Sequence, residues 1–329
     1  MKKQFTSTFG ALLLTASFAA APAWAQVTAN FGHGFPAASL HHKAALEFKD
    51  EVEKASKGAI EIHVFHSGQL GSAREMFEGL QLGTQEITWV PTARISGFAP
   101  QLQLFDLPFL FKNTEFLEKV LDGPVGQQLL DSLSSQQVTG VGFYVDGFKA
   151  MTANKPLRTL DDFKGVKFRT MESDIVMSFY RSLGADPVPM DYAEVYNGLQ
   201  MGTIDGQENP IVLIHDMKFH EVQKNLMVSE HAVLAGVLVY GSQWFEGLSA
   251  DQQKLLREAG ARLVKRQREM AREVEQQDLE AIRKSGTEVI VLNDDEKEAL
   301  REASLAVRDQ YVKAYGGELL EQIDAARAQ

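Results

Sequence analysis

Cysteine is absent from the 329-residue sequence, which excludes disulfide bonds, thiolate metal sites, a cysteine nucleophile and a lipoprotein anchor. The sequence also has no glycine-rich phosphate loop of the GxxxxGKS or GxxxxGKT type, and no serine in a nucleophile elbow. Acidic residues outnumber basic ones by 44 to 33, for a net charge of −11, and no basic cluster occurs. This balance argues against a nucleic-acid partner.

Long apolar runs are scarce as well, and the clearest one lies at the N-terminus. Lys2 and Lys3 precede an apolar run over 9–21, and Ala23-Trp24-Ala25 is a small-x-small cleavage site. We predict a signal peptide over 1–25 and a mature chain that starts at Gln26. A retained membrane anchor is the alternative, but the run is shorter than the roughly 20 residues of a spanning helix. The expected location is the periplasm of a Gram-negative bacterium, although full secretion would fit the same signal.

Strand-like and helix-like segments alternate along the rest of the chain. A first series predicts strands at 27–32, 59–65, 85–90 and 137–145, and helices at 39–58, 72–82 and 114–133. A second series predicts strands at 147–154, 165–169, 203–206 and 232–242, and helices at 173–183 and 192–201. Such alternation is typical of an α/β fold with largely parallel sheets. We expect two lobes, one formed by 26–146 with about 236–272 and the other by 147–235 with about 273–329.

One predicted helix is too long for a small domain. Ser249 and Gln252 form a capping box, and from there to about Ser285 only Gly260 interrupts good helix formers. A helix of this length would extend roughly 50 Å at 1.5 Å per residue. We therefore expect it to run across both lobes. A coiled-coil arm is the alternative, but sustained apolar a and d positions are missing over 265–277.

Two residues suggest a carboxylate-binding site. Arg169 ends a predicted strand, and its guanidinium can donate two parallel hydrogen bonds to a carboxylate and stays charged. The alternative for Arg169 is a surface salt bridge with Glu172 or Asp174. Asn209 precedes Pro210, so it could orient the same ligand or act as a helix N-cap. Open α/β sheets bind ligands at the carboxyl ends of their strands, which favours the binding role.

The other candidate ligand-binding residues have weaker support from the sequence. Glu75 could contact a ligand, although Ser72 and Glu75 also form a capping box. Trp89, near the end of the third predicted strand, could form a wall of the site. His41 and His42 are adjacent on a predicted helix and cannot share one metal ion. His63 and His66 face opposite sides of a strand or loop, so we expect no metal site.

Several segments, in order, resemble the substrate-binding proteins of tripartite ATP-independent periplasmic (TRAP) transporters of the dicarboxylate-binding type. They are FHSGQLGSAREM (65–76), FAPQLQLFDLPFLF (98–111), TLDDFKGVKFR (159–169), EVYNGLQMGTIDGQENP (194–210) and the long helix after FEGLSADQQ (245–253). The resemblance implies two α/β lobes joined by crossing strands and a long helix. These lobes would close around a small organic acid anion for delivery to a membrane permease, as a monomer, without cofactor or catalysis.

The resemblance also implies roles for individual residues. Arg169 corresponds to the carboxylate-binding arginine and Asn209 to the ligand-facing asparagine. Lys149 stands where a second basic residue often follows the hinge strand, and Glu75 matches an acid near the ligand on the first lobe. We expect groups on that lobe, such as Glu75, Gln69 or His33, to contact hydroxyl or keto substituents of the ligand.

The ligand itself stays open among C4-dicarboxylates, sugar acids, 2-oxo acids and aromatic acids. A periplasmic sensing subunit, or an enzyme acting on a small carboxylic acid, is the alternative function. Glu75 and His33 are the only acid–base pair that the sequence suggests for an enzyme.

Overall fold

The computed structural model describes residues 26–327, so the predicted signal peptide lies outside the described residues. Its strands are β1 (Val27–Gly32), β2 (Ile60–Phe65), β3 (Ile87–Pro91), β4 (Val138–Ala153), β5 (Lys167–Thr170), β6 (Asp186–Pro189), β7 (Gly206–Pro210), β8 (Asn225–Val228), β9 (Val233–Gly241) and β10 (Glu288–Val291). Its α-helices are α1 (Leu40–Ala55), α2 (Ala73–Leu82), α3 (Thr114–Leu121), α4 (Pro124–Ser132), α5 (Leu160–Phe163), α6 (Asp174–Ser182), α7 (Val195–Met201), α8 (Ile211–Asp216), α9 (Phe219–Val222), α10 (Ser242–Glu246), α11 (Ala250–Lys284), α12 (Asp294–Ala303), α13 (Leu305–Tyr315) and α14 (Glu318–Arg327). Four 3-10 turns are η1 (Thr92–Ile95), η2 (Pro100–Asp106), η3 (Leu133–Gln136) and η4 (Tyr192–Glu194). Within 26–327, no helix has both the length and the apolar character needed to cross a membrane.

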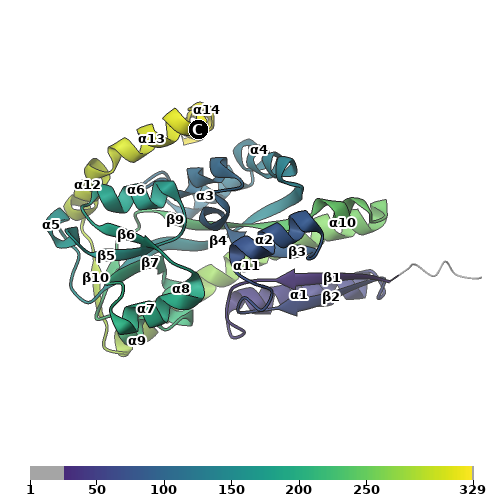
Figure 1. The fold of residues 1–329 in the computed structure, drawn as a ribbon, viewed down its shortest axis with the longest axis horizontal. Helices are drawn as coiled ribbons and strands as arrows, with labels where there is room; N and C mark the ends of the chain where they lie inside the picture. Colours follow the sequence, from purple (N-terminus) through teal and green to yellow (C-terminus); the bar gives the residue numbers. More distant parts are fainter. Residues whose placement is uncertain (1–25, 328–329) are drawn as a thin grey trace, which may run out of the picture.

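The strands form two half-sheets that share β4. The order is β2-β1-β3-β9-β4-β7-β5-β6, and β8 joins β10 to β4. β1 pairs in parallel with β2 and β3 in the first half, and β5 pairs in parallel with β6 and β7 in the second. β9 and β4 run antiparallel to their neighbours and cross between the halves, as Figure 1 shows. The predicted α/β fold with crossing strands is therefore confirmed.

The crossing strand β4 differs from the prediction of two strands at 137–145 and 147–154. It is one strand, Val138–Ala153, with a register shift against β9 between Val145 and Gly147. Gly147 has φ +116°, a backbone conformation that glycine adopts without penalty. The glycine that we took for a break is therefore a bulge inside a continuous strand. The strand pairs with β9 as far as Phe148 and with β7 from Lys149 onward.

The short strand predicted at 203–206 is also displaced. The strand is β7, Gly206–Pro210, all of it buried, and Asn209 lies opposite Ala150 of β4. The N-cap alternative for Asn209 is wrong, because α8 has Pro210 at its N-cap position and no side-chain cap. Pairing of 206–210 with β4 overrides the local Asn-Pro signal for a helix start.

The long helix α11 is confirmed, with the capping box formed by Ser249 and Gln252. It packs on α1 and β4 and also on α8, so it contacts both halves. The coiled-coil alternative is wrong, because buried side chains such as Leu256 and Ile282 face the rest of the chain. Gly260 permits close packing, since a Cβ there would lie 2.6 Å from the Tyr240 hydroxyl oxygen. The predicted helix over 114–133 is divided into α3 and α4 at Gly123.

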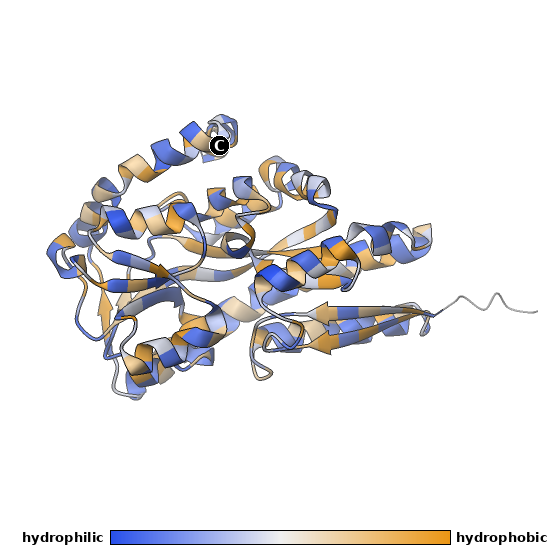
Figure 2. Ribbon diagram, in the orientation of Figure 1, coloured by the Kyte–Doolittle hydropathy of each residue, from blue (hydrophilic) through white to orange (hydrophobic). Residues whose placement is uncertain are grey.

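The C-terminal helices return to the first half. α14 packs on α3 and α4, and Leu320 and Ile323 belong to the same apolar core as Phe105 and Leu129. In Figure 1 this segment, in yellow, extends over the top of the molecule. Figure 2 shows polar and apolar residues alternating along the helices, as expected of helices that cover a sheet on one side. The lobe boundaries given above remain a proposal.

Candidate functional site

A cavity of about 360 Å³ lies between the two half-sheets, a volume suited to a small ligand. The first half contributes residues of α2, β3 and η1, and the second contributes residues of β5, β7, η4 and α8. The principal lining residues are Phe35, Ser72, Glu75, Met76, Trp89, Arg94, Arg169, Met171, Asp191, Tyr192, Glu194, Asn209, Leu213 and Leu234. Several of them stand at the carboxyl ends of strands, where open α/β sheets bind ligands.

Arg169 lies in the cavity wall, and its residue is only 1% exposed. Its Nε and Nη2 atoms donate hydrogen bonds of 3.0 and 2.8 Å to the carbonyl oxygen of Met190. No carboxylate within 26–327 forms an ion pair with it, so the salt-bridge alternative is wrong. Burial, followed by the like charge of Arg94, lowers the pKa of Arg169 to about 9. The side chain is thus a buried cation at neutral pH.

A second arginine, Arg94 of η1, lines the same cavity, and sequence reasoning missed it. Its Nη2 donates to the carbonyl oxygen of Met190 at 3.0 Å, and its Nη1 lies 3.1 Å from Oδ1 of Asp191. Burial lowers the pKa of Arg94, and Asp191 opposes that effect. The signal that could have found it is its place just after β3, because the rule that favoured Arg169 applies equally there.

Asn209 and Trp89 both line the cavity, and both side chains are buried. The Asn209 Nδ2 atom donates to Oε1 of Gln207 at 2.5 Å. Trp89 lies edge-on to Phe31 and Phe35 and is packed into the first-half core. The structure therefore brings Arg169, Asn209 and Trp89 to one cavity, as the sequence led us to expect.

Glu75 also reaches the cavity wall, although its side chain is exposed. Its Oε2 accepts the backbone N–H of Ser72 at 2.7 Å, and the Ser72 hydroxyl accepts the N–H of Glu75, which completes the capping box. The Ser72 contacts lower the pKa of Glu75, so it carries a negative charge at neutral pH. Capping and facing the cavity are compatible, because the carboxylate has two oxygens.

A family model with the description "bacterial extracellular solute-binding protein, family 7" matches residues 31–314. The chain belongs to this family. It is 34% identical over 311 residues to the C4-dicarboxylate-binding periplasmic protein DctP of Rhodobacter capsulatus, which covers 94% of this chain and 93% of the relative. It is also 34% identical over 298 residues to the 2,3-diketo-L-gulonate-binding periplasmic protein YiaO of Escherichia coli, with 89% and 90% covered.

Solved structures of other solute-binding proteins share the fold. The sugar acid binding protein of Advenella mimigardefordensis, in complex with galactonate, is 33% identical with a TM-score of 0.89, over 92% of this chain and 98% of that one. A TRAP periplasmic solute-binding protein of a Polaromonas species, bound to D-erythronate, is 33% identical with a TM-score of 0.88, over 92% and 100%. The two-lobed architecture is thus that of the family.

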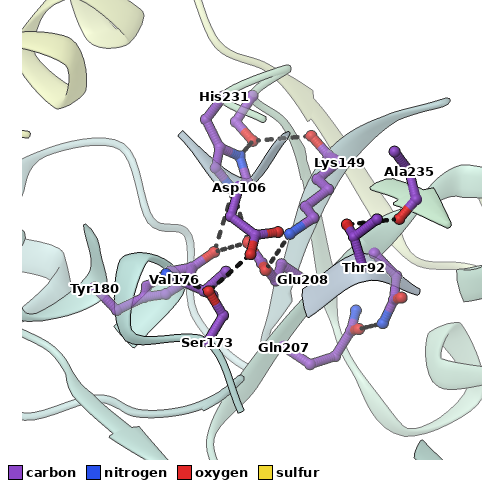
Figure 3. A network of polar contacts seen from close by, with 12 residues as sticks. Thr92, Asp106, Lys149, Ser173, Val176, Tyr180, Gln207, Glu208, His231 and Ala235 are labelled. Carbon is purple, nitrogen blue, oxygen red and sulfur yellow. Dashed lines mark hydrogen bonds and ion pairs between the residues drawn. The ribbon is translucent and has the colours of Figure 1, made fainter. Parts of the chain in front are cut away.

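Lys149 does not reach the cavity wall in this family 7 chain. Its ammonium is buried and lies 2.7 Å from Oε1 of Glu208. The other oxygen of Glu208 accepts hydrogen bonds of 2.8 Å from the Tyr180 hydroxyl and the His231 ring, as Figure 3 shows. Burial raises the pKa of Glu208, but Lys149 and His231 outweigh it and hold that pKa well below its ordinary value. The predicted ligand contact of Lys149 is therefore replaced here by an ion pair inside the second half.

His33 is likewise absent from the cavity wall. It is fully buried, and its Nε2 lies 3.1 Å from Nδ1 of His42. Burial lowers the pKa of His33 to about 3, so the ring is neutral. Gln69 is also not among the lining residues, and its Oε1 accepts the backbone N–H of His66. The acid–base pair of Glu75 and His33 considered for an enzyme is not assembled at the cavity.

Proposed function

We propose that this chain is a periplasmic receptor that captures a small organic acid anion between its lobes and delivers it to a TRAP-type membrane permease. The observation that carries the proposal is Arg169, a buried guanidinium at the cavity wall with no carboxylate partner within 26–327. A buried unpaired charge is costly in a folded protein, often by several kcal/mol. A bound carboxylate would supply the missing counter-charge and accept hydrogen bonds from the same guanidinium.

Capture follows from the placement of the cavity between two halves. A ligand that contacts residues of both favours the closed arrangement through its additional contacts. η1 and the residue after it already bridge the halves. Arg94 of η1 contacts Met190 and Asp191, and the Ser96 hydroxyl donates to the carbonyl oxygen of Glu172 at 2.5 Å. The crossing strands and α11 would act as the hinge.

The relatives support the location and the class of ligand. Those named above are periplasmic binding proteins for a C4-dicarboxylate and a diketo acid, and the structures hold galactonate and D-erythronate. We therefore propose a periplasmic location. We also propose that the chain acts as a monomer, with a permease partner and no cofactor. As a receptor it would release its ligand chemically unchanged.

A thermal-shift screen of the mature chain against an organic acid library tests the proposal, because a ligand of the folded state raises the melting temperature. The best hit is then measured by calorimetry with Arg169→Ala, which should lose at least about 2 kcal/mol of binding free energy. Arg262→Ala is the matched control, since Arg262 is an exposed α11 residue paired with Glu51. Unchanged affinity of Arg169→Ala, or turnover of the bound acid seen by mass spectrometry, would contradict the proposal.

A further inference from the structure

The charges on the cavity wall limit how many carboxylates the ligand can carry. The charged lining residues are Arg94, Arg169, Glu75, Asp191 and Glu194. Arg94 is already paired with Asp191 at 3.1 Å, so Arg169 is the cation of the wall without an acidic partner within 26–327. A second ligand carboxylate would meet the acidic side chains of Glu75 and Glu194 and a guanidinium that Asp191 already neutralises. Like charges within one cavity repel unless water screens them, and closure removes that water.

A chain of hydrogen bonds fixes which atom of Asn209 is available. Gln223 donates its Nε2 to the carbonyl oxygen of Val222 at 3.3 Å, so its Oε1 accepts the Thr152 hydroxyl at 3.1 Å. The Thr152 oxygen accepts Nε2 of Gln207 at 3.0 Å, and Oε1 of Gln207 accepts Nδ2 of Asn209. Each link determines the orientation of the next amide. Asn209 therefore keeps its Oδ1, an acceptor, for the cavity, and no residue within 26–327 donates to it.

The available acceptor lies beside the available cation. Arg169 pairs in register with Gln207 across β5 and β7, and Asn209 is two residues further along the same strand face. A carboxylate oxygen cannot satisfy Oδ1 of Asn209, because both are acceptors. A hydroxyl on a carbon close to the carboxylate can donate to it. Glu75, charged and facing the cavity, offers a second acceptor for hydroxyls from the first half.

Resting on the proposed receptor function, we propose that the ligand is a hydroxylated monocarboxylate. Its single carboxylate binds Arg169, and a nearby hydroxyl donates to Oδ1 of Asn209. The cavity of about 360 Å³ has room for a short carbon chain bearing several hydroxyls. Pairing of Arg94 with Asp191 is what rejects a second carboxylate.

Two sets of four acids test the proposal, with chain length held constant within each set. The four-carbon set is butyrate, D-erythronate, succinate and tartrate, and the six-carbon set is hexanoate, D-galactonate, adipate and galactarate. Each set contains a monocarboxylate without hydroxyls, a hydroxylated monocarboxylate, a dicarboxylate without hydroxyls and a hydroxylated dicarboxylate, in that order. In calorimetry we expect the hydroxylated monoacid of at least one set to bind at least about tenfold more tightly than its three companions, or about 1.4 kcal/mol.

A pair of variants tests the reason for the selectivity. Asp191→Asn removes the partner of Arg94 and should strengthen binding of tartrate or galactarate at least about tenfold, because a second cation becomes available. Glu194→Gln removes one charge from the same wall without freeing Arg94, so it should give a smaller gain. Equal gains from the two variants would overturn the role assigned to the pair.

The remaining outcomes are equally decisive. The proposed ligand class is overturned if a dicarboxylate binds most tightly. It is also overturned if butyrate binds as tightly as D-erythronate and hexanoate as tightly as D-galactonate. Both results leave the receptor function intact. Absence of binding to all eight acids also overturns the proposed ligand class. The receptor function itself fails if the wider organic acid library gives no ligand that depends on Arg169, or if the bound acid is turned over.

Discussion

Arg94 and Arg169 come from opposite halves of the molecule and donate to the same acceptor, the carbonyl oxygen of Met190, at 3.0 and 2.8 Å. The two cations thus share one neutral oxygen, and the charge of Arg94 contributes to the lowered pKa of Arg169. Asp191 neutralises the first guanidinium, whereas no acid between residues 26 and 327 forms an ion pair with the second. A bound carboxylate would relieve this arrangement by supplying the missing counter-charge, and this is the basis of the carboxylate site proposed above.

Arg169→Lys should weaken binding of the best acid by about 10- to 100-fold, since an ammonium cannot donate two parallel hydrogen bonds to a carboxylate. Calorimetry at constant ionic strength measures the change, and Arg262→Lys on the exposed face of α11 is the control. An affinity equal to that of the unaltered chain would show that geometry at Arg169 is unimportant.

Lys149→Met should lower the free energy of unfolding by about 3–5 kcal/mol, because it leaves Glu208 buried without its cation. The double variant Lys149→Met with Glu208→Gln should recover part of that loss. Urea unfolding gives the stability, and calorimetry on the folded variant gives ligand affinity. Weaker ligand binding without lost stability would instead favour a direct ligand contact for Lys149.

Asp106→Asn should change how stability depends on pH. Burial raises the pKa of Asp106 from 3.8 to about 6, so the stability associated with its protonated form is lost as the pH rises between these values. The asparagine variant carries no such charge and should exceed the unaltered chain by up to about 3 kcal/mol at pH 8, but not at pH 4. Urea unfolding at both pH values measures it. Asp309→Asn provides the control, because Asp309 is exposed. A stability difference between Asp106→Asn and the unaltered chain that does not vary with pH would refute the raised pKa of Asp106.

Gly236→Ala should destabilise the crossing strands by about 1–3 kcal/mol or more, because overpacking forces neighbours to move. A Cβ at this position would lie 1.9 Å from Cζ of Tyr144, its partner across β4. Gly97→Ala, with no atom within 4 Å of its Cβ, is the matched control. Thermal unfolding compares the two, and similar melting temperatures would contradict the packing described.

Local signals predicted most of the elements correctly. The capping box at Ser249 and the absence of breakers after it predicted α11, and the uninterrupted apolar run predicted β9. The errors came where pairing between distant segments overrides local preference. Gly147 resembled a strand end but lies in a bulge, and Asn209 resembled an N-cap but lies in a strand that pairs with β4.

The same division holds for the site. Arg169 and Trp89 were expected from their places at strand ends, Asn209 from its amide group and Glu75 from the family resemblance. The four residues line one cavity. Lys149 was expected there from resemblance alone. It instead forms an ion pair outside the cavity wall with Glu208, which lies 59 positions along the chain. Arg94 was missed, although its place just after β3 is the same kind of signal that favoured Arg169.

The sequence by itself determined the alternation of strands and helices, the long helix and an arginine suited to a carboxylate, since these depend on periodicity, capping and side-chain chemistry within short segments. Only the tertiary structure decided which charges are paired. Ion pairs such as Arg94 with Asp191 and Lys149 with Glu208 join residues far apart in the chain, and their distances exist only once the two half-sheets are assembled. Because the free charge of the cavity is what remains after that pairing, the type of acid it accepts is a property of the fold.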